Sequence, residues 1–169
     1  MTDPIQEADA GGLAALADIL SLNRLLALST VSPEGEAHIN TAFFAFDERF
    51  TVYLLSPPGS EHARHLLANP SAAASIYDSR QTKDERRGVQ LFGRMSQLEG
   101  EAADRALTCF GARFDDIAGA ASSADELFDR RGLKFFGLVP ERAKVFDELR
   151  LRHGDYVEFE LSRGQTRSS

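Results

Sequence analysis

The sequence predicts a closed or partly closed antiparallel β-barrel with a few flanking helices, and three observations predict it. About six to eight short strand-like segments follow one another at hairpin spacing. Only a few helical segments interrupt them, which disfavours a doubly wound parallel sheet. The chain has 169 residues, 43% of them apolar, which is enough for one hydrophobic core. Without an internal repeat or a domain-sized linker, we expect a single domain over residues 1–169.

The first third of the chain predicts a helix followed by a three-stranded meander. Leu13, Leu16 and Leu20 recur at helical spacing. A helix is therefore expected over about residues 10–21, in an N-terminal segment (1–22) that packs on the barrel. Alternating β-rich runs then indicate antiparallel strands joined by short polar turns, at Leu25–Val31, Ala37–Phe46 and 50–56.

Helix breakers and periodicity define the remaining elements. Pro57-Pro58-Gly59 ends the third strand, and Ser60 is a good N-cap for a helix that Pro70 ends at about residue 69. The rest of the pattern predicts strands at 71–77 and 89–95, a polar loop at 79–86, a helix at 101–114, a short helix from Ser122, strands at 133–139, 142–146 and 156–161, and a frayed tail over 162–169.

Composition limits the compartment and the partners. The single cysteine, Cys109, has no partner for an internal disulfide, which favours a reducing compartment and an inert, buried thiol. No run of about 18 apolar residues and no basic, apolar leader is present, so we expect a cytoplasmic protein without membrane association. A net charge of −7 repels phosphate backbones, so no nucleic-acid partner is expected.

The common catalytic motifs are absent from the sequence. GxGxxG, Walker, GxSxG and CxxC patterns do not occur, which removes the usual indications of nucleotide binding, hydrolysis and thiol redox chemistry. His62 and His65 are three residues apart on the expected second helix, a spacing that suits a metal ion. No carboxylate or thiol cluster completes the ligand set, so hydrogen-bonded or surface histidines are predicted and no metal site.

The segment 56–64 is the most informative one for function. A loop that opens into a helix presents free N–H groups and the positive end of the helix dipole. Ser60, His62 and Arg64 add side-chain donors there, so the segment is a candidate anion site. The alternative interpretation is an ordinary helix cap with a solvated Arg64.

Two strands offer a surface for a flat ligand. Ser71 to Ser75 are all small, which permits the close approach of a ring, although barrel taper explains the same pattern. Gln90 lies on the face opposite to Val89, where its amide suits the edge of a heterocycle or is simply exposed. Residues 79–94 carry +3 and residues 99–129 carry −6, so an anionic ligand favours the former region.

The order of these motifs resembles the pyridoxamine 5′-phosphate oxidase-like, FMN-binding split β-barrel superfamily, especially a small uncharacterised branch. The matching segments cover about residues 23–148: the turn 32–35, the strand 41–47, Leu54-Leu55-Ser56 with Gly59 to Arg64, Arg87-Gly88-Val89-Gln90, Gly93, and Leu98-Glu99-Gly100-Glu101. The resemblance implies a mainly β, Greek-key-like split barrel with flanking helices. It also implies a homodimer with FMN, or a related deazaflavin, at the subunit interface.

The resemblance further implies a set of cofactor-binding residues. Ser60, His62 and Arg64 would hold the phosphate. Backbone groups at Asn40, Thr41, Ala42, Leu55 and Ser56 would line the isoalloxazine, with Arg87 or Gln90 added from the fifth strand. Many flavin-binding members have a basic pair where this chain has Glu61-His62. A carboxylate about 4 Å from a phosphate charge costs about 4 kcal/mol at an effective dielectric of ~20, so Glu61 either points away or weakens FMN binding.

The leading functional prediction is an FMN-dependent oxidoreductase that transfers a hydride to or from a small-molecule substrate. The catalytic residue is unknown, and Tyr77 is only a weak candidate proton donor, more typical of a core or interface aromatic residue. The alternatives are a non-catalytic flavin-binding module and a relative that binds deazaflavin, haem or no cofactor. Segment 150–153 is only superficially similar to the substrate signature of the oxidase proper, so pyridoxamine phosphate oxidation is not predicted.

Overall fold

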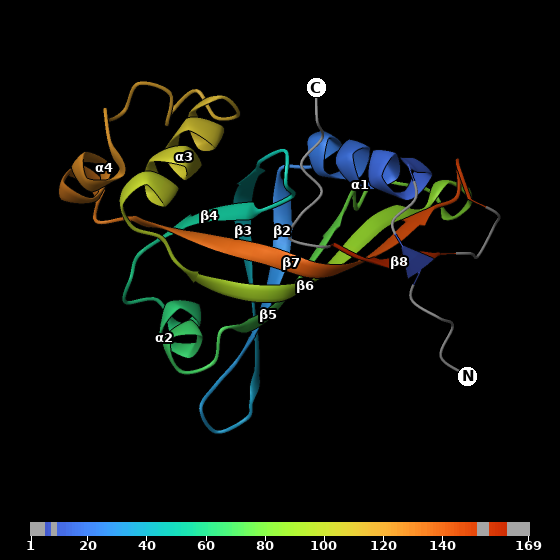
Figure 1. Cartoon of the computed structure of the whole chain (residues 1–169), viewed down its shortest axis with the longest axis horizontal. Helices are drawn as coiled ribbons and strands as arrows, with labels where there is room; N and C mark the ends of the chain where they lie inside the picture. The colour runs from blue at the N-terminus through green and yellow to red at the C-terminus, as the bar shows by residue number, and fades with distance from the viewer. Residues whose placement is uncertain (1–5, 8–9, 152–155, 162–169) are drawn as a thin grey trace.

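The computed structural model of the chain describes residues 6–7, 10–151 and 156–161. The tail expected over 162–169 and positions 152 and 153 of the segment 150–153 therefore lie outside the described residues. Six strands close an antiparallel barrel in the order β7-β4-β3-β2-β5-β6 and back to β7. They are β2 (Leu25–Val31), β3 (Ala37–Phe46), β4 (Val52–Ser56), β5 (Ser71–Tyr77), β6 (Arg87–Gln97) and β7 (Lys134–Asp147). The predicted split barrel with flanking helices is confirmed (Figure 1).

Two short strands and four α-helices surround the barrel. The strand β8 (Val157–Glu160) pairs antiparallel with β7, and β1 (Gln6–Glu7), which the sequence did not predict, pairs parallel with β8. The helices are α1 (Ala10–Leu22), α2 (Glu61–Ala68), α3 (Gly100–Gly111) and α4 (Ala124–Arg131). In Figure 1, α3 and α4 lie together at one end and α1 lies toward the other. No helix among the described residues is long and apolar enough to cross a membrane.

The alternation of side chains along β4 divides the apolar residues into two clusters. Val52 and Leu54 face the barrel interior, where they join α1 and one face of α2. Tyr53 packs with the second cluster, which α3 and α4 form on the outside of β3, β4 and β7. The partly exposed Cys109 borders this second cluster, and burial raises the pKa of its thiol, in agreement with an inert cysteine.

The two strands expected at 133–139 and 142–146 are one continuous strand, β7. In the sequence, Pro140 lies in the gap between the two expected strands. In the structure it pairs with Gly93, where the β6–β7 register shifts. Proline is tolerated at such a bulge, where a ladder hydrogen bond is already missing. A Cβ on Gly93 would lie 2.1 Å from the Val139 carbonyl oxygen, so the glycine allows this close approach. The bulge lets β7 continue and close the barrel.

Several predicted element ends shift by a few residues. The third strand begins at Val52 rather than at residue 50, because Phe50 has a positive φ of 62° in a turn. Asp47 closes that turn with both its backbone and its carboxylate. The helix expected to reach residue 114 ends at Gly111, and Phe114 follows in a further turn. The polar loop 79–86 contains one short 3₁₀ turn, at Lys83–Glu85.

Candidate functional site

The turn from β4 into α2 brings three polar side chains together. Ser56 Oγ donates to Ser60 Oγ at 3.3 Å. His62 Nε2 lies 2.9 Å from Ser56 Oγ and 3.1 Å from Ser60 Oγ. Ser56 and His62 are each only 8% exposed. We call Ser56, Ser60 and His62 the Ser–His cluster.

The Ser–His cluster lies at the start of a helix whose cap is incomplete. Ser60 has the extended N-cap backbone, but its hydroxyl makes no capping hydrogen bond to the helix. The first N–H groups of a helix lack intrahelical partners. The Ser60 hydroxyl does not accept from the first N–H groups of α2, so they have no side-chain cap. The positive end of the helix dipole adds to these donors. Side-chain and backbone donors therefore converge at this turn.

A second polar group ties α2 to β2 and β3. The fully buried Thr30 Oγ1 lies 3.2 Å from His65 Nδ1, and the His65 ring meets the His38 ring edge-on at 5.2 Å between centroids. His38 Nδ1 is in turn 3.5 Å from Glu61 Oε1. The register of β2 and β3 places Thr30 directly opposite His38. Thr30, His38, Glu61 and His65 thus form a chain of side-chain contacts, with a ring contact between the two histidines, which we call the histidine relay.

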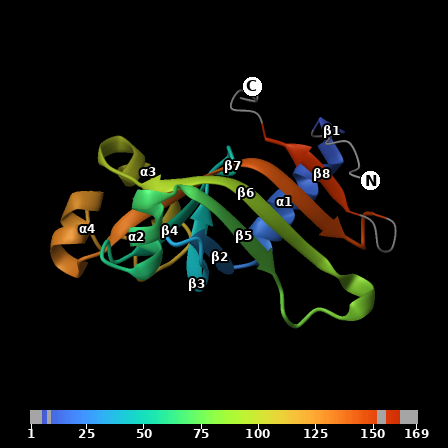
Figure 2. The same cartoon turned by 90° about the horizontal axis from the view of Figure 1, so that it is seen from below.

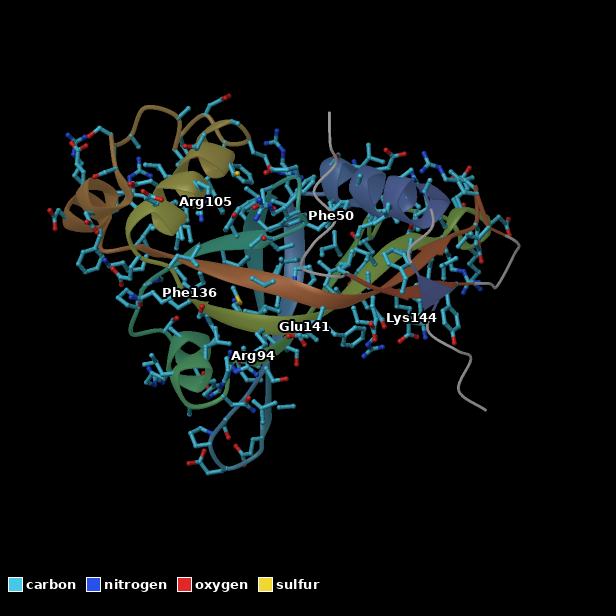
Figure 3. The ribbon with its side chains drawn as sticks, viewed as in Figure 1. Phe50, Arg94, Arg105, Phe136, Glu141 and Lys144 are labelled. Atoms are coloured by element: carbon cyan, nitrogen blue, oxygen red, sulfur yellow. The ribbon has the colours of Figure 1, made fainter. Side chains whose placement is uncertain are left out.

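His62 is neutral near neutral pH. Burial lowers the pKa of its imidazole, and the nearby rings of His38 and His65 lower it further, whereas Glu61 raises it. The His62 ring also meets Phe136 of β7 edge-on at 6.3 Å. Figure 3 shows Phe136 near the start of β7, close to α2. The imidazole is therefore an uncharged hydrogen-bonding group with an apolar neighbour on one side.

Two of the residues predicted around this turn lie outside the Ser–His cluster. Arg64 is exposed and donates to the Gly59 carbonyl at 2.6 Å, so its guanidinium braces the loop before α2. Leu55 packs with the cluster of α3 and α4, because neighbouring strand residues point to opposite faces. Glu61 points toward His38, which is the first of the two arrangements expected from the sequence. There its carboxylate contacts the His38 ring.

The predicted residues of β3 do not share a face. Ala42 packs against the barrel core, and Thr41 is exposed on the other side of the strand. Asn40 lies in register with the buried Leu28, and its Oδ1 is buried without a hydrogen-bond partner. Residues 40–42 could therefore contact a ligand through their backbone groups and, on the outside of the barrel, through the Thr41 side chain.

Arg87 and Gln90 lie toward the other end of the sheet from the Ser–His cluster. α2 leads directly into Ser71, which pairs with Arg94, whereas Gly88 pairs with Tyr77 at the far end of β5 (Figure 2). Arg87 donates to the buried carboxylate of Asp147 at 3.1 Å. Gln90 is exposed and pairs with Ser75 and with Lys144, which Figure 3 shows far from Phe136 along β7. Within one chain, these two residues do not join the cluster.

A surface pocket of about 220 Å³ lies at that far end. Its lining includes Tyr77, Gly88 and Phe146. Tyr77 is 54% exposed, so it is not a core residue and remains a candidate interface aromatic. Among the described residues, no group of three histidine, cysteine or acidic side chains is arranged to hold a metal ion.

The sequence patterns missed Thr30 and His38 as part of the site. One signal was present: Thr30 is a polar residue at an inward position of the alternating strand β2, where a buried hydroxyl needs a partner. Only the sheet register identifies that partner.

The family model described as pyridoxamine 5′-phosphate oxidase matches residues 13–144. The chain belongs to this family. The match includes the barrel strands up to Lys144, near the end of β7, and both polar groups around α2.

The chain is also similar in sequence to the UPF0306 protein YhbP. The UPF0306 protein YhbP from Escherichia coli (strain SMS-3-5 / SECEC) is 32% identical over 85 residues, which are 50% of this chain and 58% of that protein. The chain therefore matches less than two thirds of the length of this relative.

Solved structures extend the likeness to haem proteins. HutZ, the haem storage protein from Vibrio cholerae, aligns with a TM-score of 0.64 and 22% identity, covering 79% of this chain and 92% of HutZ. A haem-binding protein from Mycobacterium smegmatis aligns with a TM-score of 0.69 and 18% identity, covering 93% of this chain and 60% of that chain. At these identities the likeness extends to the fold alone.

Proposed function

We propose that this chain is an FMN-dependent oxidoreductase and that the Ser–His cluster binds the phosphate of the flavin. One observation carries the proposal: the Ser60 hydroxyl is directed to Ser56 and His62 instead of capping α2. The turn therefore offers hydroxyl and imidazole donors together with uncapped backbone N–H groups, which is the donor set that a phosphate prefers.

The direction of the Glu61 side chain reduces the main objection to a phosphate here. A carboxylate beside a phosphate would be repulsive. The Glu61 carboxylate lies instead 3.5 Å from His38 Nδ1, and its side chain is 58% exposed to screening solvent. His38 therefore gives Glu61 a partner outside the Ser–His cluster.

The flavin would supply the redox chemistry by exchanging a hydride with a small-molecule substrate. The residues of this chain would bind and orient it. Ser56, Ser60 and His62 would fix the phosphate, and the backbone of β3 and the end of β4 would line the ring system. None of the described residues needs to act as an acid or base for this role.

We also propose a homodimer, because an apolar strip is uncovered on the outside of the barrel. Leu25 and Phe43 are cross-strand partners, and both they and Ile39 are 47–68% exposed. Exposed apolar residues gathered on one face are typical of an interface. A second copy that covers this strip could bring its own Gln90 or Arg87 to the cofactor, which one chain alone does not do.

Haem is the competing ligand, because two similar solved structures are described as haem-binding or haem-storing. An axial histidine needs a free ring nitrogen that faces a cavity. His62 Nε2 and His65 Nδ1 are both engaged with hydroxyl groups. The Nε2 contacts of His62 favour the phosphate assignment at the Ser–His cluster. Each ring keeps a second nitrogen, so the absorbance spectrum decides between flavin and haem.

The absorbance spectrum of the protein as isolated tests the proposal. We expect flavin bands, release of FMN on denaturation, and rebinding of FMN by the apoprotein. Ser60→Asp should abolish FMN retention while the riboflavin affinity stays within about twofold, because a carboxylate then faces the phosphate. Thr82→Asp, at an exposed position of the polar loop 79–86, is the charge-matched control and should leave FMN retention unchanged. A Soret band, or a colourless protein that ignores added FMN and deazaflavin, would overturn the assignment.

A further inference from the structure

We propose that His62 makes phosphate recognition proton-linked, so that the site takes up a proton with a phosphorylated flavin and holds it more tightly as the pH falls. This inference rests on the proposed function. It adds a specificity-determining role for His62: the imidazole distinguishes a flavin with a terminal phosphate from one without it by changing its own charge.

The geometry places one titratable ring at the centre of the donor set. In the Ser–His cluster, His62 is the only member that can gain a charge between about pH 5 and 8. Its Nε2 contacts both serine hydroxyls, so any anion bound by these hydroxyls also comes close to the ring. A hydroxyl pair without the histidine would bind the anion with no change in protonation.

Without ligand, the surroundings keep His62 neutral. Burial disfavours the imidazolium, and the rings of His38 on β3 and His65 on α2 oppose a further positive charge. Glu61 is the acidic group whose field reaches the ring, and it acts in the other direction. From β7 the neighbour is the apolar Phe136, and from β4 it is the uncharged Ser56.

Two cations from the elements around the Ser–His cluster are directed elsewhere. Arg64 donates to the Gly59 carbonyl. Lys134, which is opposite Ser56 in the β4–β7 register, directs its ammonium to Asp125 at 3.6 Å and Glu99 at 3.8 Å. The charge that balances a bound phosphate is therefore most directly supplied by protonation of His62.

The direction of the linkage follows from these charges. A phosphate beside His62 favours the imidazolium, so the pKa of the ring is higher in the complex than in the free protein. Between these two pKa values, binding takes up a proton, and the affinity rises as the pH falls by up to about tenfold per pH unit. Riboflavin lacks the phosphate and should show no such dependence.

Calorimetry in buffers of different ionisation enthalpy measures this proton uptake. FMN and riboflavin are titrated into the apoprotein between about pH 6 and 8, for the wild type and for His62→Gln. The amide keeps a donor at this position without the titration. We expect the wild type to take up more protons per bound FMN than the variant does. The difference between the two proteins corrects for the protons that FMN itself gains or loses.

A second measurement remains informative if His62→Gln no longer binds FMN. The His62 ring protons, followed by NMR during a pH titration of the wild type, should show a higher pKa with FMN bound than without it. An unchanged pKa, or equal proton uptake by wild type and variant, would overturn the inference and leave the phosphate site intact. No preference for FMN over riboflavin at any pH would instead overturn the proposed function.

Discussion

Ser56 and His62 meet at 2.9 Å across the turn between β4 and α2, although both side chains are more than nine-tenths buried. A buried hydroxyl and a buried imidazole stabilise the fold only when they are paired. The contact therefore fixes the start of α2 and also assembles the proposed phosphate site. Stability and ligand binding are coupled at this turn, and the following predictions separate the two.

The stability of the ligand-free protein should decrease as the pH falls below the ordinary histidine range. His62 has a lowered pKa in the folded protein, so the unfolded chain binds more protons once the pH falls through about 6.5. That difference favours unfolding until the pH reaches the lower, folded-state pKa. Urea unfolding at several pH values measures the effect. His62→Gln should flatten this part of the profile, and an equally steep profile for the variant would assign the slope to other groups.

Thr30→Val should destabilise the protein by about 1–3 kcal/mol, because it leaves His65 Nδ1 buried without its partner. Valine keeps the shape of the side chain, so the loss reports the hydrogen bond. Thr41→Val, on the exposed face of β3, is the matched control and should change the free energy of unfolding by less than about 0.5 kcal/mol. Equal effects of the two substitutions in urea unfolding would contradict a structural role for the histidine relay.

Gly93→Ala should destabilise the barrel by about 1–3 kcal/mol or more, because the new methyl group meets the backbone of Val139 and Pro140. These neighbours are backbone atoms at the β6–β7 closure and have little freedom to move. Gly59→Ala adds a methyl group in open space and serves as the control. The two thermal unfolding midpoints should differ by several degrees, and similar midpoints would argue against the tight bulge.

Arg87→Met should cost roughly 1.5–3 kcal/mol, because it removes the closer of two guanidinium partners of the fully buried Asp147 carboxylate and leaves Arg150 at 3.9 Å. Adding Asp147→Leu to the same protein should recover most of this loss, since no buried charge is then left unpaired. The comparison is made on the protein without flavin. If the single variant unfolds like the wild type and only FMN affinity changes, Arg87 belongs to the cofactor site rather than to the barrel.

Local sequence patterns were sufficient for most elements of the barrel. Alternation predicted the strands because each strand has one face toward a core, and Pro57-Pro58-Gly59 marked the turn before α2 because its backbone cannot continue a strand. The same local logic failed at Pro140. Its effect depends on Gly93, which lies 47 positions earlier in the chain and meets it only in the closed barrel.

The candidate site divides in the same way. Ser56, Ser60 and His62 fall within seven consecutive residues, so the turn alone brings them together. Their link to Thr30 and His38 requires the β2–β3 register and the packing of α2 on the barrel. Within one chain, the antiparallel pairing of β5 and β6 carries Arg87 away from α2. Its predicted role at a cofactor between two subunits stays a prediction.

By itself, the sequence determined the barrel strands, the helix after the double proline and the proximity of Ser60 and His62, because these depend on side-chain alternation and on contacts a few residues apart. Only the tertiary structure decided that His62 is buried and neutral, that Glu61 turns to His38, and that Arg87 supports Asp147 instead of the cluster. Burial and long-range charge pairing are properties of the packed barrel, which no local pattern encodes.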